Sequence, residues 1–361
     1  MIRKPELLAP AGDEESLLCA LDYGADAVYL AGKTFGMRAA AKNFDEEGLV
    51  WAVQTAHEKG AKVYITCNIV PNNDEADAFP SFIKSAEKAG VDAVIAADIG
   101  VISMIKEHAP NMEIHASTQT GVVNYRTALE LYKMGVKRVV LAREVDLENI
   151  KIIREKIPDD MEIEVFVHGA MCVSFSGRCL ISEYLTGRNA NRGQCAQSCR
   201  WEYYLMEQKR PGEFYKVFED ERGSFILNAR DMCMIEHLDD LIKAGVSSFK
   251  IEGRAKSAYY TALTTNGGQY FADSNYVRKY DFCAAVDYCE NGVMHLTVRN
   301  FFTLNDELEL VIPHREPIKF TPKTMFGANG EEIDTARHAM EKITVLTDIE
   351  APARSLIRKK I

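Results

Sequence analysis

Short apolar runs alternate along the first 260 residues with longer stretches of helical periodicity. The runs are rich in Val, Ile and Ala and show little polar alternation, which is typical of strands buried on both faces. Helical stretches end at glycines such as Gly60 and Gly90, where the left-handed C-cap conformation costs glycine nothing. The runs cover residues 6–10, 26–31, 62–67, 92–97, 113–117, 138–142, 162–168 and 248–253.

Strand–helix repeats of this kind build a parallel sheet with right-handed crossovers. Eight repeats predict an α/β fold, a closed (βα)8 TIM-like barrel over residues 1–275, with an open doubly wound sheet as the alternative. A chain of 361 residues has room for a barrel of ~250 residues and one small domain. Active sites of such barrels lie on loops at the C-terminal ends of the strands. We therefore expect Gln119, Arg143, His168 and the segment 252–254 at the barrel mouth.

The pattern changes after residue 275. Apolar and polar residues alternate there, with a turn signal at 290–292, which predicts antiparallel hairpins in a small C-terminal β-domain over 276–361. Cys283 and Cys289 lie in the first hairpin, and we expect them to be buried apolar residues rather than metal ligands.

Charge limits how the chain could bind nucleic acid. The formal net charge is −10, whereas a protein that grips nucleic acid through a general basic field is usually positive. Any RNA contact must then come from a local patch. Candidate RNA-binding residues are Arg188, Arg192 and Arg200 beside a group of cysteines, and the C-terminal run Arg354, Arg358, Lys359 and Lys360.

The sequence also predicts where the chain works. It has no apolar run long enough to span a bilayer, and residues 1–16 lack the apolar core of a signal peptide. We expect a cytoplasmic protein without a membrane partner. In that compartment clustered cysteines favour metal or redox chemistry over structural disulfides.

Four of the nine cysteines fall between residues 170 and 200, in a loop-like stretch that follows the seventh strand directly. A fifth, Cys233, lies near the start of a predicted helix, where a thiol pKa is lowered. Together they define a Cys-rich insertion, 170–233. The spacings of 7, 16, 4 and 34 residues fit the two close pairs of a structural zinc site poorly. An iron–sulfur cluster, a zinc site and uncoordinated thiols all remain open from the pattern.

Other chemistries have little support in the sequence. It contains no His-Glu-x-x-His, no Gly-x-Ser-x-Gly and no P-loop, and no Gly-x-Gly-x-x-Gly follows a strand. His168 ends the seventh strand, where it could act as an acid, a base or a ligand, or serve as a hydrogen-bonded structural residue.

Six segments resemble the collagenase-like peptidase family U32 over residues 3–260: ELLAPAG, GADAVYLAG, FVHGAMCVSFSGRC, TGRNANRGQCAQSCRW, LNARDMCMIEHL and SFKIEGRAK. Within the family the chain is similar to the branch that forms 5-hydroxyuridine at the wobble position of tRNA without O2. The resemblance implies a [4Fe–4S] cluster and prephenate as co-substrate. It places the metal ligands on Cys172, Cys179, Cys195 and Cys233, with Cys199 as the alternative fourth ligand.

A prephenate dianion needs cationic groups and hydrogen-bond donors at the barrel mouth. We expect it to be bound by Gln119, Arg143, Lys250 and Arg254, and we expect catalytic roles for His168, Glu252 and Arg143. The alternative for the charged residues is an internal ion-pair network, with Arg143 on Glu144 or Glu252.

One departure from the family bears on the partners. The segment that leads from 252–254 to the β-domain is shorter here than in the longer hydroxylation proteins, so a second family member could act as a partner subunit beside tRNA. The competing functions are an O2-independent hydroxylase or accessory subunit for rRNA or a quinone precursor, a U32-type peptidase, and a non-catalytic metal-binding scaffold.

Overall fold

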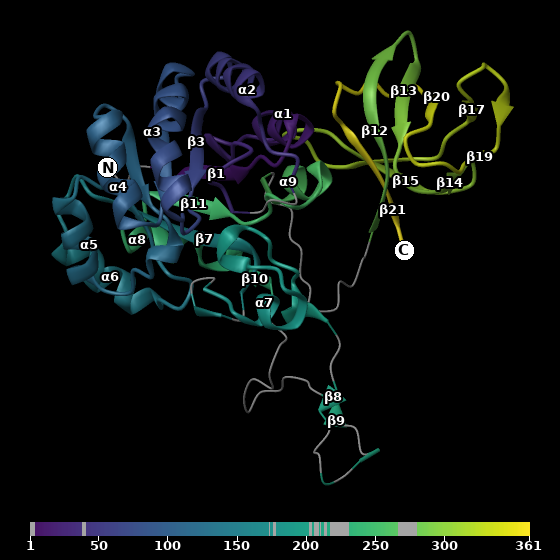
Figure 1. The fold of residues 1–361 in the computed structure, drawn as a ribbon. Coiled ribbons are helices and arrows are strands. Elements are labelled where there is room, and N and C mark those ends of the chain that lie inside the picture. Colours follow the sequence, from purple (N-terminus) through teal and green to yellow (C-terminus); the bar gives the residue numbers. More distant parts are fainter. Residues whose placement is uncertain are drawn as a thin grey trace. The chain divides into compact units, whose positions relative to one another are not determined.

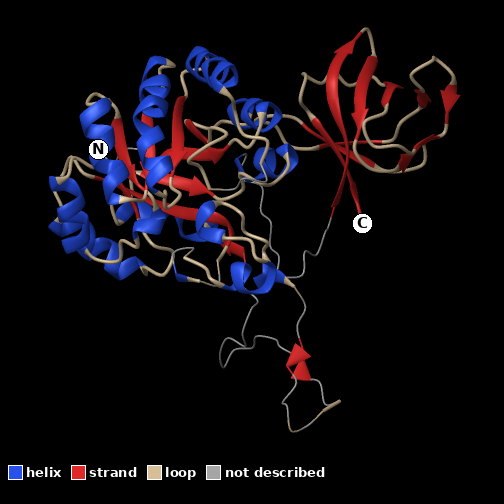
Figure 2. Ribbon diagram, in the orientation of Figure 1, coloured by secondary structure: helices blue, strands red, loops and turns tan. Residues whose placement is uncertain are grey.

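The computed structural model describes residues 4–37, 41–172, 174–175, 178–201, 204–205, 209, 211–212, 215–216, 231–265 and 280–361. Contacts divide the chain into two units, Met1–Leu21 with Ala25–Ser274, and Asp22–Gly24 with Asn275–Ile361. The sequence-based boundary lies between residues 275 and 276. Figure 1 labels the elements of both units, and Figure 2 separates helices from strands by colour.

Eight parallel strands form a closed barrel in the first unit (Figure 1). Strands β1 to β6 pair in chain order, and β6 pairs with β7. Strand β11 pairs with both β7 and β1, which closes the ring. The predicted (βα)8 barrel is confirmed, and the open-sheet alternative is wrong. The strands are β1 (Glu6–Pro10), β2 (Ala27–Leu30), β3 (Lys62–Cys67), β4 (Ala93–Ala96), β5 (Glu113–Ala116), β6 (Arg138–Val140), β7 (Glu162–Ala170) and β11 (Ser248–Ile251).

Helices surround the barrel, and polar caps begin several of them. Asn72 and Glu75 form a capping box at the start of α3, in which each side chain accepts from the other residue's backbone N–H. Gly60 and Gly90 end two helices with φ of +74° and +85°, as their spacing predicts. The helices of this unit are α1 (Glu14–Asp22), α2 (Glu46–Glu58), α3 (Asn73–Lys88), α4 (Ile99–His108), α5 (Tyr125–Lys133), α6 (Leu147–Lys156), α7 (Ile181–Thr186), α8 (Leu238–Lys243) and α9 (Ala258–Thr265).

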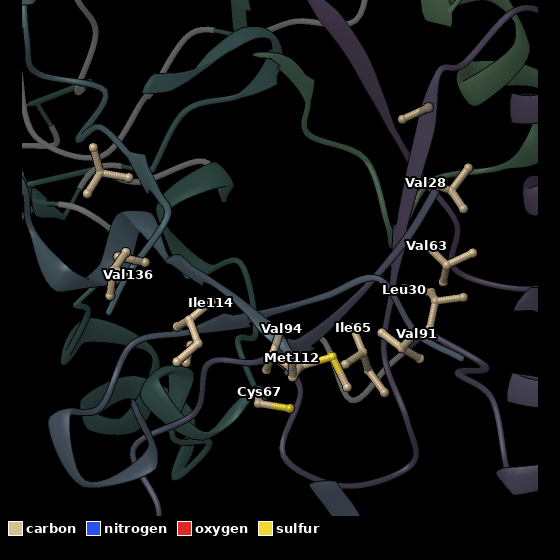
Figure 3. Packing of buried hydrophobic residues seen from close by; sticks show 14 of the residues in the cluster. Val28, Leu30, Val63, Ile65, Cys67, Val91, Val94, Met112, Ile114 and Val136 are labelled. Atoms are coloured by element: carbon tan, nitrogen blue, oxygen red, sulfur yellow. The ribbon is translucent and has the colours of Figure 1, made fainter. Parts of the chain in front are cut away.

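The strands bury apolar side chains on both of their faces. One large buried cluster joins strand residues to the helices, and Figure 3 shows its part around Val28, Val63 and Ile65. Each such side chain contributes ~1.5–3 kcal/mol when it is fully buried. The strand residues that alternate with these along the chain belong to a separate buried cluster, which includes Leu8, Tyr29, Tyr64 and Ile95. Because successive side chains of a barrel strand alternate between outside and inside, this second cluster fills the barrel interior.

The second unit contains an eight-stranded antiparallel sheet, as the alternating pattern predicts. Its first hairpin turns at Asn291 and Gly292 with φ of +52° and +77°, and positive φ at both positions is the requirement of a type I′ turn. Cys283 is fully buried in this domain's core, and the partly buried Cys289 packs against that core, so the apolar prediction for Cys283 is confirmed. The sheet consists of β16 (Ile318–Phe320), β15 (Leu308–Val311), β21 (Leu356–Lys360), β12 (Tyr280–Glu290), β13 (Val293–Val298), β20 (Lys342–Leu346), β17 (Thr324–Phe326) and β18 (Glu332–Ile333).

The C-terminal basic run is part of this sheet and not a solvated tail. Strand β21 is hydrogen-bonded to β12 on one side and to β15 on the other. Arg358 pairs with Glu309 at 2.7 Å, and Lys359 pairs with Asp306 at 3.2 Å. These two cations are paired with carboxylates inside the domain, and RNA binding by the basic run stays a prediction.

The remaining described elements are short. They include the strand β10 (Asp231–Cys233), the pairs β8 (Tyr204–Leu205) with β9 (Tyr215–Lys216) and β14 (Phe302–Thr303) with β19 (Thr335–Ala336), and 3-10 turns of three residues. Most of the segment between residues 201 and 231 lies outside the described residues. Among the helices of the described part, none has the length and apolar character needed to cross a bilayer.

Candidate functional site

A cavity of about 170 Å³ lies at the mouth of the barrel. Its floor and walls come from the C-terminal ends of the strands, including Thr66, Gln119 and Phe166, and its cover comes from the segment after β7. Four cysteines line it: Cys172, Cys179, Cys195 and Cys199. The cysteine run follows the seventh strand directly in the sequence, and the structure places it at the barrel mouth.

Cys233 has a different position. It ends strand β10, which runs antiparallel to β7, and its register partner is His168. The helix start expected next to Cys233 begins only at Leu238, after a 3-10 turn, so the argument from a helix N-terminus is wrong for this thiol. Cys233 is not among the described residues that line the cavity, whereas Cys199 is. The arrangement therefore favours Cys199 over Cys233 as the fourth thiol of the site.

The four thiols fit the requirements of an iron–sulfur cluster. Such a cluster takes one thiolate on each of four irons, so the sulfurs need to surround a space and do not need to converge on one point. The described His, Cys, Asp and Glu side chains contain no group of three that could hold one metal ion, whereas four thiols surround a single cavity. None of the nine cysteines, all of them in the described residues, forms a disulfide.

Hydrogen-bond donors surround two of the sulfurs, and for Cys179 they lower the pKa of the thiol. Burial raises the pKa of the Cys179 thiol, but hydrogen bonds from the Ser174 side chain and from the backbone N–H groups of Ser182 and Ile181 outweigh it, so the pKa lies below its usual value. The backbone N–H of Gln197 also donates to Cys195 Sγ at 3.3 Å. Thiolates are the form in which cysteine binds a metal.

Residues 171–201, here called the cysteine cap, are held together by hydrogen bonds between side chains and backbone. Ser182 Oγ donates to the Arg188 carbonyl at 2.8 Å and accepts from the Ala196 N–H at 3.0 Å. Asn191 Nδ2 donates to the Cys179 carbonyl at 3.3 Å. These bonds tie α7 to the loop that carries Cys195, so the positions of the cysteines depend on one another.

The three arginines predicted to bind RNA have different surroundings. Arg192 forms an ion pair of 2.6 Å with Glu75 and so anchors the cap to the start of α3. Its charge is thus paired with a carboxylate, and its role as an RNA-binding residue stays a prediction. Arg188 is exposed and donates to the carbonyls of Gln194 and Cys195, at 3.2 and 3.4 Å. Arg200 ends a 3-10 turn, and its side chain lies outside the described residues.

Cationic side chains outnumber acidic ones around the cavity. Arg143, Lys250 and Arg254 line it together with one carboxylate, Glu252. Arg143 pairs with Glu252 at 3.2 Å, which is one of the ion pairs that the sequence left open, and its guanidinium stacks 3.9 Å from the Phe166 ring centroid. Arg254 is buried and donates to the neutral hydroxyl of Thr66. Lys250 in turn pairs with the buried Glu164, so these described side chains carry three positive and two negative charges, and the remaining excess suits an anionic ligand.

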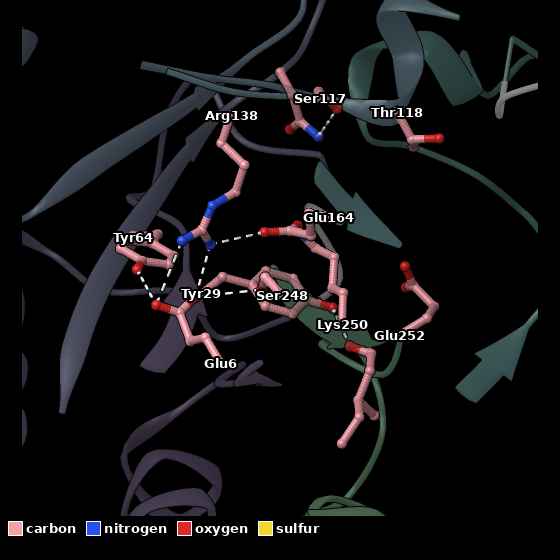
Figure 4. A network of polar contacts seen from close by, with 12 residues as sticks. Glu6, Tyr29, Tyr64, Ser117, Thr118, Arg138, Glu164, Ser248, Lys250 and Glu252 are labelled. Carbon is pink, nitrogen blue, oxygen red and sulfur yellow. Dashed lines mark hydrogen bonds and ion pairs between the residues drawn. The ribbon is translucent and has the colours of Figure 1, made fainter. Parts of the chain in front are cut away.

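Lys250 connects the cavity to a buried ion-pair network inside the barrel (Figure 4). Its ammonium lies 2.6 Å from Glu164, which is fully buried, and Glu164 lies 3.1 Å from Arg138. Arg138 also pairs with Glu6 and Glu162, both at 2.6 Å. Burial raises the pKa of Glu164, but the charges of Lys250 and Arg138 outweigh it and lower the pKa to about 2. Glu164 therefore stays ionised at neutral pH.

His168 is not among the described residues that line the cavity. Its Nδ1 lies 3.0 Å from the Tyr260 hydroxyl, and that hydroxyl donates to the Glu252 carbonyl at 3.0 Å. The structure thus favours the structural role for His168 over the catalytic one. The neighbouring Gly169 has φ of +113°, and a Cβ there would clash with the Glu252 carbonyl. The glycine therefore lets β7 pack closely against the end of β11.

Gln119 presents an unsatisfied acceptor to the cavity. Its side chain is 8% exposed, and its Oε1 atom is buried without a hydrogen-bond partner in the described part of the chain. A buried polar atom of this kind costs ~1–3 kcal/mol unless a ligand or water completes it. The position of Gln119 on the cavity wall is the one expected from the sequence.

A closed (βα)8 barrel with a cationic, thiol-lined cavity at its C-terminal face has the architecture of a barrel enzyme with a ligand site at the strand ends. Comparison with known protein families shows to which family the chain belongs. The chain belongs to peptidase family U32: residues 12–304 match that family, and residues 278–358 match the peptidase family U32 C-terminal domain.

The names of individual relatives state different activities. The tRNA hydroxylation protein P1 of Bacillus subtilis is 34% identical over an alignment of 404 positions. This alignment covers 99% of this chain and 95% of the relative. The 23S rRNA 5-hydroxycytidine C2501 synthase of Escherichia coli is 39% identical over 72% of this chain and 38% of its own length. A collagenase of Porphyromonas gingivalis is 36% identical over 71% of this chain and 62% of its own length.

Proposed function

We propose that this chain is an RNA hydroxylase that forms 5-hydroxyuridine at the wobble position of tRNA, without O2 and with prephenate as co-substrate. The proposal is carried by one observation: four thiols and three cations surround the same cavity at the barrel mouth. Kinship with the tRNA hydroxylation protein P1 over 99% of the chain supports tRNA as the substrate. A tRNA substrate would place the reaction in the cytoplasm.

In this proposal the cavity holds a [4Fe–4S] cluster on Cys172, Cys179, Cys195 and Cys199, with Cys233 as the alternative to Cys199. When bound there, such a cluster would supply one-electron chemistry beside the substrate. Replacing C–H by C–OH is a two-electron oxidation, so a reaction without O2 needs a co-substrate that accepts two electrons, with the oxygen coming from that co-substrate or from water. Prephenate takes this place in the proposal.

The cavity residues fit the groups of prephenate. Its two carboxylates require cations, which Arg143, Lys250 and Arg254 supply, and arginine binds carboxylates in a fork geometry. Its ring hydroxyl is a donor that could satisfy the buried Oε1 of Gln119. Glu252 holds Arg143 in place and remains the acidic candidate for proton transfer in the cavity.

Neutralising either arginine should impair the reaction while the cluster remains. For Arg143→Met and Arg254→Met we expect the KM for prephenate to rise by ~30-fold or more, because removing one partner of a buried, hydrogen-bonded charge pair costs ~2–5 kcal/mol. Steady-state kinetics on iron-matched preparations measure this effect, and Arg126→Met on α5 is the control.

A double variant separates ligand binding from the ion pair. Arg143→Met with Glu252→Gln removes both members of the pair and so leaves no unpaired buried carboxylate. It should recover stability without recovering affinity for prephenate. Wild-type kinetics in both single variants would remove the anion site from this face of the barrel.

A peptidase function has a named relative in its favour but no matching site. No histidine is among the described residues that line the cavity, so no Cys–His or Ser–His pair forms there. Hydroxylation of rRNA remains the second candidate, because the rRNA 5-hydroxycytidine synthase matches 72% of the chain.

Expression in bacteria that lack their own tRNA hydroxylation gene tests the function. Mass analysis of tRNA nucleosides should show 5-hydroxyuridine or its derivatives when this chain is present. Restoration of 5-hydroxycytidine in 23S rRNA alone would instead support the second candidate.

A further inference from the structure

The outer face of the cysteine cap carries large apolar side chains that are exposed to solvent. Tyr184 is 88% exposed and Leu180 is 71% exposed, and they lie four residues apart, so both are on the same side of α7. Phe175 and Trp201 are 52% and 49% exposed in the same cap. A cluster of exposed aromatic residues is a feature of binding surfaces.

The inner face of the same cap lines the cavity. Ile181 and Ser182 of α7 face it, as do Cys179 and Cys195 on either side of α7. Residues of the cap thus line the cavity, while Leu180 and Tyr184 in the same segment are exposed to solvent. A ligand seated on the outer face would lie next to the entrance of the proposed active site.

The cap is also the basic part of an acidic protein. Residues 171–201 contain four arginines (178, 188, 192 and 200) and one acidic residue, Glu183, which gives a net charge of +3, whereas the whole chain has −10. Arg178 and Arg188 donate to backbone carbonyls, of Gln119 and of Gln194 and Cys195. Among the described residues neither forms an ion pair with a carboxylate, and both belong to the same segment as the exposed aromatic residues.

We infer that the outer face of the cysteine cap binds the single-stranded loop of the RNA substrate, with Tyr184 and Trp201 as stacking surfaces for bases and Arg178 and Arg188 as contacts to phosphates. The inference rests on the proposed RNA hydroxylation and names the surface that presents the RNA to that site. Stacked aromatic residues with interspersed arginines are the arrangement that single-stranded nucleic acids require, because every base has a π-face and every linkage a negative charge.

The position of the cap agrees with the chemistry. A base must leave its stack before an enzyme can reach its ring carbon, and bases in a loop are the least costly to remove. Bases held on the outer face would keep the loop open beside the cavity, so that one neighbouring base could enter it. An exposed aromatic face without positive charge would fit a protein partner better, and the +3 charge of the cap is the reason to prefer RNA.

Binding of a fluorescent anticodon stem-loop RNA to the full-length, cluster-loaded protein tests this surface. Tyr184→Ala should weaken binding by about fivefold or more, the lower bound for the loss of one stacked base. Tyr184→Phe keeps the ring and should bind as the wild type does. Arg188→Gln should reduce the slope of log affinity against log salt by ~0.7, the value for one phosphate contact on a single strand. Phe301→Ala, at an exposed aromatic residue of the β-domain, is the control.

The outcomes separate this inference from the proposed function. If wild-type protein hydroxylates tRNA and Tyr184→Ala binds the stem-loop with unchanged affinity, the surface assignment is wrong and the function stands. Unchanged RNA affinity together with a loss of self-association in Tyr184→Ala would make the face a protein interface and would also overturn the inference. If wild-type protein modifies no RNA, the proposed function itself fails.

Discussion

Replacing Cys172 or Cys179 by serine is expected to abolish iron binding and RNA hydroxylation together. Both thiols line the barrel-mouth cavity, and a serine hydroxyl is a poor substitute for a thiolate on iron. Anaerobic reconstitution followed by iron and sulfide analysis should give about four irons per wild-type chain and almost none for either variant. Visible absorption provides an independent readout of the cluster.

The same series decides the fourth ligand. Cys199→Ser should lose the cluster and Cys233→Ser should keep it, because Cys199 lines the cavity and Cys233 ends strand β10 outside the described lining. Cys283→Ala is the matched control, since that thiol is buried in the core of the β-domain. Equal loss of iron from the control and the cavity variants would mean general misfolding and would contradict the assignment.

The second large effect concerns the ion-pair network under the cavity. Arg138→Met should lower the free energy of unfolding by ~3–5 kcal/mol, because it leaves the buried Glu164 and the nearby Glu6 without their shared guanidinium. Urea unfolding at pH 7 measures the change. Arg126→Met on the barrel exterior is the control, and a loss below ~0.5 kcal/mol in Arg138→Met would show that the network does not stabilise the barrel.

The network also predicts how stability depends on pH. The pKa of Glu164 is lowered from 4.5 to about 2 in the folded chain, so its ionised form stabilises the fold. That contribution is fully present above pH 4.5 and is lost as the pH falls toward about 2. Unfolding measured between pH 6 and pH 3 should show this loss in the wild type and not in Glu164→Gln.

The sequence predicted the barrel well because its signal is local. Each buried strand is a compact apolar run, and glycines such as Gly60 and Gly90 mark the helix ends. Once eight repeats are placed in a ring, the strand ends converge, so Gln119, Arg143 and Arg254 could be assigned to one mouth before any coordinates were known. The structure brings all three to the cavity.

The pairing of charges could not be predicted in the same way. Whether Arg192 faces RNA or Glu75 depends on two residues 117 positions apart. The interior network went unnoticed, although Glu164 and Arg138 interrupt otherwise apolar strands, and charged residues in such strands need partners across the barrel. The contacts of His168 and of the C-terminal basic run were hard to predict for a related reason, because their partners come from distant segments.

The most direct test of the proposed function is an anaerobic reaction of purified, cluster-loaded protein with unmodified tRNA and prephenate. Mass analysis of the digested tRNA should then show 5-hydroxyuridine at the wobble position, formed only when prephenate is present and absent with Cys172→Ser. A loaded wild-type protein that leaves every uridine unchanged under these conditions would contradict the account.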